Sequence, residues 1–438
     1  MKLTIIGGGS IFTPLLLDGL HKYQDELLFD QVALLDIDLE AAERVASFTR
    51  RSLARHDKPV PRLLPTRDHQ QAIEGSDFVV ITIRVGGLAA RVQDEKIPLR
   101  YGIFGDETTG PGGFSNALRT IPVMVDYGRE IERWAPQAWV IPFTNPEGLL
   151  TEAMTRHTSV RAIGLCTAPY GLRLGVATHL GVDIRRVQAD MIGVTHTGWV
   201  RSITVDGDEV LPGLVDQVLS QSREDALYPV ELMRALDAYP AHWFFTLIGY
   251  EAPHFYYHAR RVYERQIAEG RTRGEVLIMR QKEILPRLSS PDFTVEELSS
   301  LREHRVLGDP ILSLMSALQN DKAEVHVVDV PQRGAVPTFE PEAVIELPAR
   351  IDAQGAHPLS VRALPAEVRG LMHAIKAYEE LTIEAAVRGS YAVALRALVA
   401  HPLVMSYQTA KPLLDDILNA NRPYLPAAWS VERATSRS

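Results

Sequence analysis

The chain opens with a short apolar run, Leu3–Ile6, that ends directly in three glycines and is followed by a helical pattern. Short runs of this kind read as buried strands, and they alternate with helical segments through the first half of the chain. The runs are Leu3–Ile6, Val32–Asp36, Phe78–Ile83, Trp139–Thr144 and Ala162–Leu165. Strand–helix–strand alternation predicts a parallel sheet with right-handed crossovers.

The pattern changes after about residue 195, where amphipathic helices dominate and strand-like pieces are few, such as Glu324–Val330 and Ala343–Ile351. The clearest helix covers residues 366–389, because apolar residues recur there every three or four positions and Gly389 is placed like a C-terminal cap. We therefore predict an α/β domain with a doubly wound parallel sheet over residues 1–195. A mixed, mainly helical α+β domain is predicted over residues 196–438.

Composition narrows the class of protein. A formal net charge of −9 argues against a general nucleic-acid binder, although a pocket needs only a few local cations to take an anion. The chain has no apolar stretch near the ~20 residues that span a bilayer, and its first apolar run is too short for a signal peptide. One cysteine excludes an internal disulfide and suits a reducing compartment. We expect a soluble cytoplasmic protein without nucleic-acid or membrane partners.

The glycines after the first strand predict a dinucleotide site. Glycine lets the backbone approach a pyrophosphate, and a helix N-terminus favours negative charge. The loop predicted to contact the cofactor comprises Gly7, Gly9, Ser10 and Ile11, with Phe12 where a third glycine is usual. Asp36 ends the second strand, where a carboxylate binds a ribose diol and repels the extra phosphate of NADP; Asp38 is a nearby alternative. The loop therefore favours NAD.

Further loops follow the later strands, at the edge where open α/β sheets bind ligands. Arg84 and a glycine pair follow one strand, and Asn145 follows another. Cys166, the only cysteine, follows the run Ala162–Leu165. Taken alone, this thiol could be a small core residue or a thiolate with a chemical role.

Several longer motifs resemble those of one family. IRVGGLAAR, IPLRYGIFGDETTGPGG, FTNPEGLLTEA and the C-terminal KAYEELTIEAA with HPLV are similar to motifs of the NAD- and metal-dependent glycosidases of glycoside hydrolase family four. The similarity is greatest to the 6-phospho-β-glucosidase-like members and runs from GGGS to about Leu425. It implies a Rossmann domain, a mixed second domain, and homodimers or homotetramers.

The resemblance also implies an unusual hydrolysis. NAD⁺ takes a hydride from C3 of the sugar, and a divalent metal, usually manganese, polarises the resulting ketone. A base removes the C2 proton, the aglycone is eliminated, water adds, and the hydride returns. The family is an exception to the two-carboxylate mechanism of most glycosidases.

Site residues follow from the resemblance one by one. Cys166, in the motif GLC, and His196, in GVTH, match the two metal ligands. Asn145 matches an asparagine that contacts the sugar, and Arg84 an arginine at the substrate and cofactor. Arg273, in GRTRGEV, matches a candidate phosphate clamp, a role that suits the bidentate guanidinium.

Two positions depart from the family. Thr167 stands where members carry Asp or Asn; it can hydrogen-bond a sugar hydroxyl but cannot act as a general acid at neutral pH. Ala252 stands where the family has its tyrosine base. The nearby side chains that could replace that tyrosine are Tyr250, His254, Tyr256 and Tyr257. A one-gap alignment on Pro253 favours Tyr256, with Tyr250 as the other catalytic candidate; Tyr256 and Tyr257 could also simply pack.

We therefore predict a glycosidase that uses NAD and a divalent metal, with a 6-phospho-glycoside as first substrate and unphosphorylated or uronate glycosides as the next. Two alternatives remain at this point. The first is an NAD-dependent dehydrogenase acting on a hydroxy acid or sugar. The second is an inactive protein that binds NAD and a sugar as a sensor, which the missing tyrosine permits.

Overall fold

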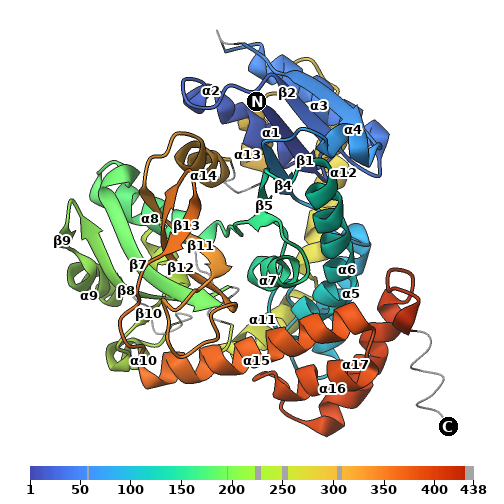
Figure 1. The fold of residues 1–438 in the computed structure, drawn as a ribbon. Coiled ribbons are helices and arrows are strands. Elements are labelled where there is room, and N and C mark those ends of the chain that lie inside the picture. Colours follow the sequence, from blue (N-terminus) through green and yellow to red (C-terminus); the bar gives the residue numbers. More distant parts are fainter. Residues whose placement is uncertain (57–58, 195, 222–227, 249–254, 303–307, 430–438) are drawn as a thin grey trace.

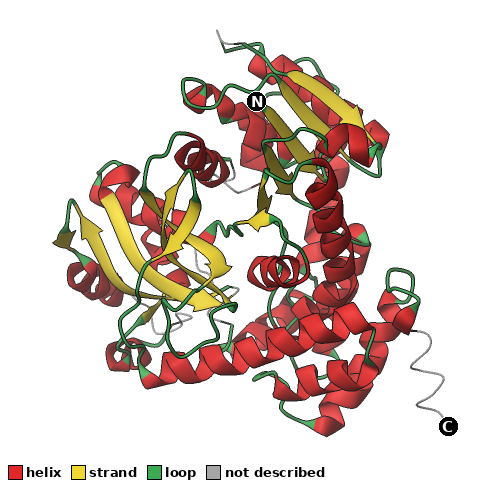
Figure 2. Ribbon diagram, viewed as in Figure 1, coloured by secondary structure: helices red, strands yellow, loops and turns green. Residues whose placement is uncertain are grey.

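The computed structural model describes residues 1–438 except 57–58, 195, 222–227, 249–254, 303–307 and 430–438. Figure 1 shows two sheets, the first near the N-terminus and the second formed by green and orange strands. A long helix, α15 (Ala366–Arg388), runs from beneath the second sheet to the C-terminal helices. Figure 2 shows helices around both sheets.

The first sheet contains six parallel strands in the order β3-β2-β1-β4-β5-β6. This order reverses direction beside β1, as in doubly wound dinucleotide-binding folds, and confirms the predicted fold class. Its strands are β1 (Lys2–Ile6), β2 (Gln31–Leu35), β3 (Arg62–Thr66), β4 (Phe78–Ile81), β5 (Trp139–Pro142) and β6 (Arg161–Ala162). The helices of this half are α1 (Thr13–Asp18), α2 (Leu20–Tyr23), α3 (Leu39–Leu53), α4 (His69–Ile73), α5 (Gly87–Leu99), α6 (Gly110–Trp134), α7 (Glu147–His157) and α8 (Ala168–Leu180).

The end of the last parallel strand differs from the prediction. Strand β6 stops at Ala162, although the apolar run continues to Leu165. Gly164 instead exchanges two backbone hydrogen bonds with Asp329, at 3.0 and 2.9 Å. An added Cβ at Gly164 would lie 2.9 Å from the Cβ of Asp329, so glycine is required for this approach. The bridge joins the first sheet to the second.

The second sheet is antiparallel and has the order β10-β8-β7-β12-β11. Its strands are β7 (Val187–Val194), β8 (Thr197–Val205), β10 (Tyr239–Pro240), β11 (Glu324–Pro331) and β12 (Val344–Asp352), with β9 (Asp208–Glu209) paired to β8 and β13 (Gly355–Pro358) paired to β12. Strands β11 and β12 confirm the two predicted strand-like pieces. The predicted domain boundary at residue 195 falls between β7 and β8, so residues on both sides of it contribute to this sheet.

Helices from the second half of the chain pack around the second sheet, and some of them also pack against the first domain. The remaining helical segments are η1 (Ile184–Arg186), α9 (Leu211–Gln221), α10 (Val230–Ala235), η2 (Ala241–Ile248), α11 (Ala259–Glu269), α12 (Arg273–Arg287), α13 (Val295–Arg302), α14 (Asp309–Gln319), α16 (Tyr391–Ala400) and α17 (Tyr407–Asn421). Helix α12 packs on α5, and α13 packs on α1. The ring of Phe293, between α12 and α13, lies 5.7 Å from that of Phe48 on α3. The core of the first domain therefore includes residues from the second half of the chain.

Helix α15 bears out the sequence pattern in detail. Val368, Met372 and Ile375 are buried, and Gly389 ends the helix in the left-handed conformation with φ of 70°. On the same helix Lys376 forms a buried ion pair of 2.8 Å with Glu152 of α7. In the part of the chain that is described, no helix combines the length and the apolar character needed to cross a membrane.

An ion pair without solvent contact fixes α6 against α5. The Arg119 guanidinium lies 2.6 Å from one oxygen of Asp94 and 2.7 Å from the other, and it also donates to the Val85 carbonyl and the Asn421 side chain. Burial raises the pKa of the Asp94 carboxyl, and Arg119 opposes this effect. Because the pair is fully enclosed, removing one partner would leave a buried charge without compensation.

We predict that Arg119→Met lowers the free energy of unfolding by about 3–5 kcal/mol. The matched control is Arg129→Met on the same helix, whose exposed pair with Asp126 should contribute about 1 kcal/mol or less. Urea unfolding followed by circular dichroism measures both. Equal effects of the two substitutions would contradict this account of the pair.

Candidate active site

Cys166 lies where the two sheets meet. The Gly164–Asp329 bridge positions the backbone two residues before it, and α8 begins two residues after it. The side chain is buried, and the Ala168 N–H lies 3.4 Å from Sγ. The chain thus places its only thiol at the carboxyl edge of the parallel sheet, next to a helix N-terminus.

Two other ligand-type side chains lie beside this thiol. Glu147, the first residue of α7, and His196, between β7 and β8, each bring a ligand atom within 4.8 Å of the others and of Sγ. The Nε2 atom of His196 is 3.7 Å from Oε1 of Glu147. His196 has φ of 59°, an uncommon value for a residue with a side chain. Cys166 and His196, the two predicted metal ligands, therefore lie close together, and Glu147 adds a third ligand-type group.

The surroundings of these three groups carry an excess of buried acid. Glu147, Asp329 and Glu346 are all buried near Cys166. Burial raises the pKa of the Cys166 thiol, and the carboxylates of Glu147 and Glu346 raise it further. Burial and the neighbouring acids also raise the pKa of Asp329 and of Glu346 well above the usual range. A cation at this point would relieve the repulsion and favour the ionised groups.

A second group of side chains is organised by one carboxylate, Glu107, on the loop before α6. Its Oε2 accepts from Arg84 at 2.9 Å, and its Oε1 lies 2.6 Å from Arg91 and 3.4 Å from the Asn145 amide. Burial alone would raise the pKa of this carboxyl, but Arg84 and Arg91 hold it at about 2. Two of the three predicted substrate residues, Arg84 and Asn145, therefore meet through an acid that the sequence analysis did not single out.

The ion pairs around Glu107 continue to the start of α12, where Arg273, the predicted phosphate-binding residue, lies. Arg91 contacts Glu95 at 2.7 Å, and the other oxygen of Glu95 accepts from the Gly274 N–H at 2.6 Å. Gly274 follows Arg273, which is the exposed first residue of α12. Helix α12 begins with a capping box formed by Thr272 and Glu275. The start of α12 is thus fixed to α5, the helix that carries Arg91.

The glycine loop after β1 has the geometry of a close backbone approach. An added Cβ at Gly7 would lie 2.8 Å from the Thr82 carbonyl oxygen, and Gly7 has φ of 89°. Asp36 accepts from the Gly9 N–H at 2.8 Å and from the Asp38 N–H at 2.9 Å. The side chain of Asp38 caps α3 by accepting from Ala41. Asp36 therefore supports the loop, and Asp38 has a structural role.

The catalytic candidates are less closely grouped. Thr167 is half-buried at the position before α8 and makes no side-chain capping bond. The Tyr256 hydroxyl lies 3.5 Å from Nε2 of the buried His401, and their rings stack at 5.9 Å. Burial, then Tyr378 and Glu379, raise the pKa of Tyr256. Tyr250 lies outside the described residues.

Sequence reasoning missed Glu107 and Glu147, although both stand in quoted motifs. Glu147 follows a strand at the ligand-binding edge and Glu107 stands in a glycine-rich loop, but acids at such places are commonly surface residues. Burial distinguishes them, because a fully buried charged side chain needs a partner. That information becomes available only with the fold.

Comparison with known proteins gives a consistent result over the whole chain. Residues 2–182 match the model for the family 4 glycosyl hydrolases, and residues 191–404 match the model for the family 4 glycosyl hydrolase C-terminal domain. A probable 6-phospho-beta-glucosidase of Bacillus subtilis is 34% identical, covering 97% of both chains. A 6-phospho-beta-glucosidase of Escherichia coli is 30% identical over 97% of this chain and 96% of its own. A maltose-6'-phosphate glucosidase of Bacillus subtilis is 28% identical with the same coverage.

Solved structures agree with this result. The 6-phospho-beta glucosidase of Thermotoga maritima, solved with NAD and glucose-6-phosphate, superposes with a TM-score of 0.89 at 28% identity, covering 97% of this chain and 99% of that one. The same enzyme has also been solved with manganese, NAD⁺ and glucose-6-phosphate, and superposes with a TM-score of 0.86. A lactate dehydrogenase from a deep-sea metagenome, 15% identical with a TM-score of 0.51, shares the fold alone, covering 95% of this chain and 98% of that one. The match of both domain models and the full-length relatives show that this chain belongs to family 4 of the glycosyl hydrolases.

Proposed function

We propose that this chain hydrolyses glycosides, with 6-phospho-glucosides as the first candidates, through redox-neutral elimination and addition with NAD⁺ and a divalent metal. When bound, NAD⁺ accepts a hydride from C3 of the sugar and later returns it, and the metal polarises the C3 ketone. The observation that carries the proposal is the meeting of Glu147, Cys166 and His196 at the carboxyl edge of the sheet that bears the dinucleotide loop.

The three side chains fit a divalent metal. The Oε2 atom of Glu147 is buried and has no hydrogen-bond partner among the described residues. A thiolate, an imidazole and a carboxylate leave coordination positions open for sugar oxygens, as catalytic metal sites require. The carboxylate supplies the oxygen ligand that manganese prefers, which the thiol and imidazole alone would not. Manganese is therefore the first candidate.

The glycine loop fits the pyrophosphate of NAD. Side chains at Gly7 or Gly8 would collide with neighbouring strands, so the loop leaves backbone exposed next to the start of α1. The Asp36 carboxylate, held by Gly9, favours a ribose diol over the phosphate of NADP. We keep Ser10, Ile11 and Arg84 as further cofactor contacts.

Substrate binding is proposed for the side chains around Glu107. This carboxylate holds Arg84 and Asn145 so that both lie at the edge of the sheet that also carries Cys166. Arg273 would bind the phosphate. The hydrogen bond from the Gly274 N–H to Glu95 fixes the backbone next to Arg273. The 6-phospho-beta-glucosidase of Escherichia coli and the maltose-6'-phosphate glucosidase of Bacillus subtilis both have a phosphorylated substrate in their names. This favours a 6-phosphate over a neutral sugar.

Tyr256 is proposed as the base that removes the C2 proton. Because the Leu403 N–H donates to Nδ1 of His401, the neutral imidazole carries its proton on Nε2, facing the Tyr256 hydroxyl. A proton on that nitrogen stabilises a phenolate and so opposes the burial that raises the pKa of Tyr256. Thr167, next to Cys166, would hydrogen-bond a sugar hydroxyl. Tyr250 remains the second candidate base, and a homodimer or homotetramer remains a prediction.

The activity test uses aryl glucosides of both anomers, with and without a 6-phosphate, in the presence of NAD⁺ and Mn²⁺. We expect aglycone release without net NADH, a kinetic isotope effect for substrate deuterated at C2, and exchange of that position with solvent. Activity that persists without both NAD⁺ and metal would contradict the mechanism. Stoichiometric NADH would instead identify a dehydrogenase, and binding without turnover a sensor.

A second prediction concerns Glu147 as a metal ligand. Glu147→Ala should weaken Mn²⁺ binding at least about tenfold in calorimetric titration, because it removes the oxygen ligand. Glu147→Gln, which keeps shape but not charge, should give an intermediate loss. The matched control is Glu380→Gln, a half-exposed acid on α15 that is paired with Arg156. Unchanged affinity in both Glu147 variants would exclude this residue from the metal site.

A further inference from the structure

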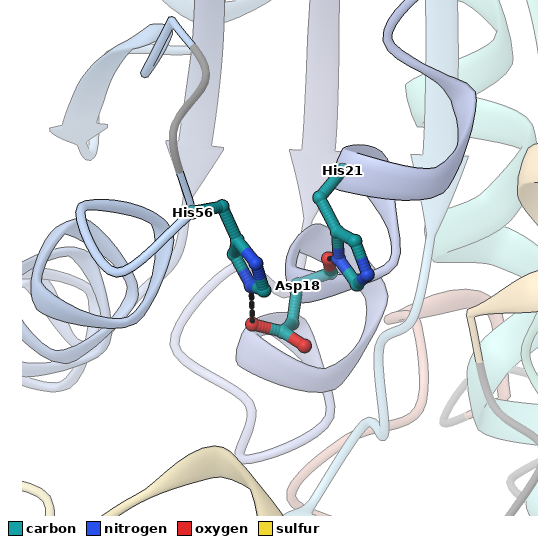
Figure 3. Close-up of side chains that lie close together, drawn as sticks. All are labelled: Asp18, His21 and His56. Atoms are coloured by element: carbon teal, nitrogen blue, oxygen red, sulfur yellow. Dashed lines mark hydrogen bonds and ion pairs between the residues drawn. The ribbon is translucent and has the colours of Figure 1, made fainter.

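A second cluster of ligand-type side chains lies far along the chain from Cys166. It contains Asp18, the last residue of α1, His21 in α2, and His56 after α3. One ligand atom of each lies within 4.8 Å of the others. Figure 3 shows the two imidazoles beside Asp18, with His56 joined to its carboxylate. The three side chains come from three separate elements that pack together.

The hydrogen bonds of the cluster leave ligand atoms available. The carboxylate of Asp18 accepts from Ser52 at 2.7 Å and from Nε2 of His56 at 3.2 Å, and both bonds fall on Oδ1. Nδ1 of His21 lies 2.5 Å from the Asp18 carbonyl oxygen. Because a carbonyl only accepts, this nitrogen carries the proton, and Nε2 of the neutral ring has a lone pair. A histidine bonded to a carbonyl in this way is typical of metal ligands.

The cluster also borders open space. A cavity of about 320 Å³ is lined by Asp18 and His21, and by Glu296 and Asp309 from the second half of the chain. The side chains of Asp18 and His56 are 18% and 31% exposed, so solvent ions reach them. Lys22, at the same cavity, forms an ion pair with Asp309 at 3.1 Å and thereby neutralises that acid. Asp18, Glu296 and Asp309 outnumber Lys22 among the charged side chains that line this cavity, so its net negative charge favours a hydrated cation.

We propose that Asp18, His21 and His56 bind a divalent ion of the zinc class. Two imidazoles and one carboxylate are ligands that zinc accepts, with water completing the tetrahedron. The imidazoles now stack at 4.0 Å and 8°, so both must turn for their nitrogens to converge on one ion. Their partial exposure permits this movement. The bound ion ties α1 and α2 to the end of α3, the elements that follow the dinucleotide loop.

This site does not depend on the catalytic proposal, and a crystal of the unaltered chain tests it directly. After soaking in Zn²⁺, anomalous diffraction at the zinc edge should show a peak bounded by Asp18, His21 and His56. A zinc peak at Cys166 would be separate evidence on the catalytic metal. An anomalous map with no zinc peak between the three side chains would overturn the proposal.

A solution experiment isolates the site from the catalytic one. In the Cys166→Ser, His196→Gln chain, equilibrium dialysis should retain about one zinc ion, and His56→Gln or Asp18→Asn should weaken its binding at least about tenfold. The matched control is His69→Gln, which removes another half-exposed histidine paired with a carboxylate, Glu130, at 2.8 Å. Circular dichroism confirms folding. Equal losses in the control and the cluster variants, or no retained zinc, would overturn the site.

Discussion

The meeting of a thiol, an imidazole and a carboxylate at the junction of two sheets is the constraint on which the rest of the structure depends. Glu147, Cys166 and His196 come from α7, the end of the first sheet and the β7–β8 hairpin, so both sheets must be in place before they approach. The Gly164–Asp329 bridge secures that junction and brings a further acid to it. Such an arrangement concentrates negative charge in a buried region, which a divalent cation stabilises.

The substrate loops depend on a second buried charge. Glu107 holds Arg84 and Arg91, and through Arg91 and Glu95 the network reaches the start of α12. Arg84 and Arg91 outweigh burial and lower the pKa of Glu107 to about 2, so its carboxylate is charged at neutral pH. Since the network links loops far apart in sequence, it orients arginines whose long side chains would otherwise sample many rotamers. Side chains that are already held in place can stabilise a transition state without further reorganisation.

Local patterns in the sequence predicted much of the fold. A short apolar run or a helical spacing is visible in residues that are neighbours along the chain. The sequence therefore predicted β1, β2, β4, β5, β11, β12 and the Gly389 cap of α15. Strand β3 was missed because Pro65 and Thr66 interrupt its apolar run at the sheet edge. The approach of Cys166 to His196 followed from family motifs. Glu107 and Glu147 could not be distinguished from surface acids, since only tertiary packing buries them. The roles of Tyr256, Thr167 and Arg273 remain predictions.

The most direct test of a metal at Cys166 is the absorption spectrum of the chain loaded with Co²⁺. Because Cys166 is the only cysteine of 438 residues, a thiolate-to-cobalt charge-transfer band reports this position alone, whatever other sites bind the ion. We predict that the band grows with added Co²⁺ and is absent from the Cys166→Ser chain. A cobalt-loaded protein without the band, or an identical band in Cys166→Ser, would contradict the central claim.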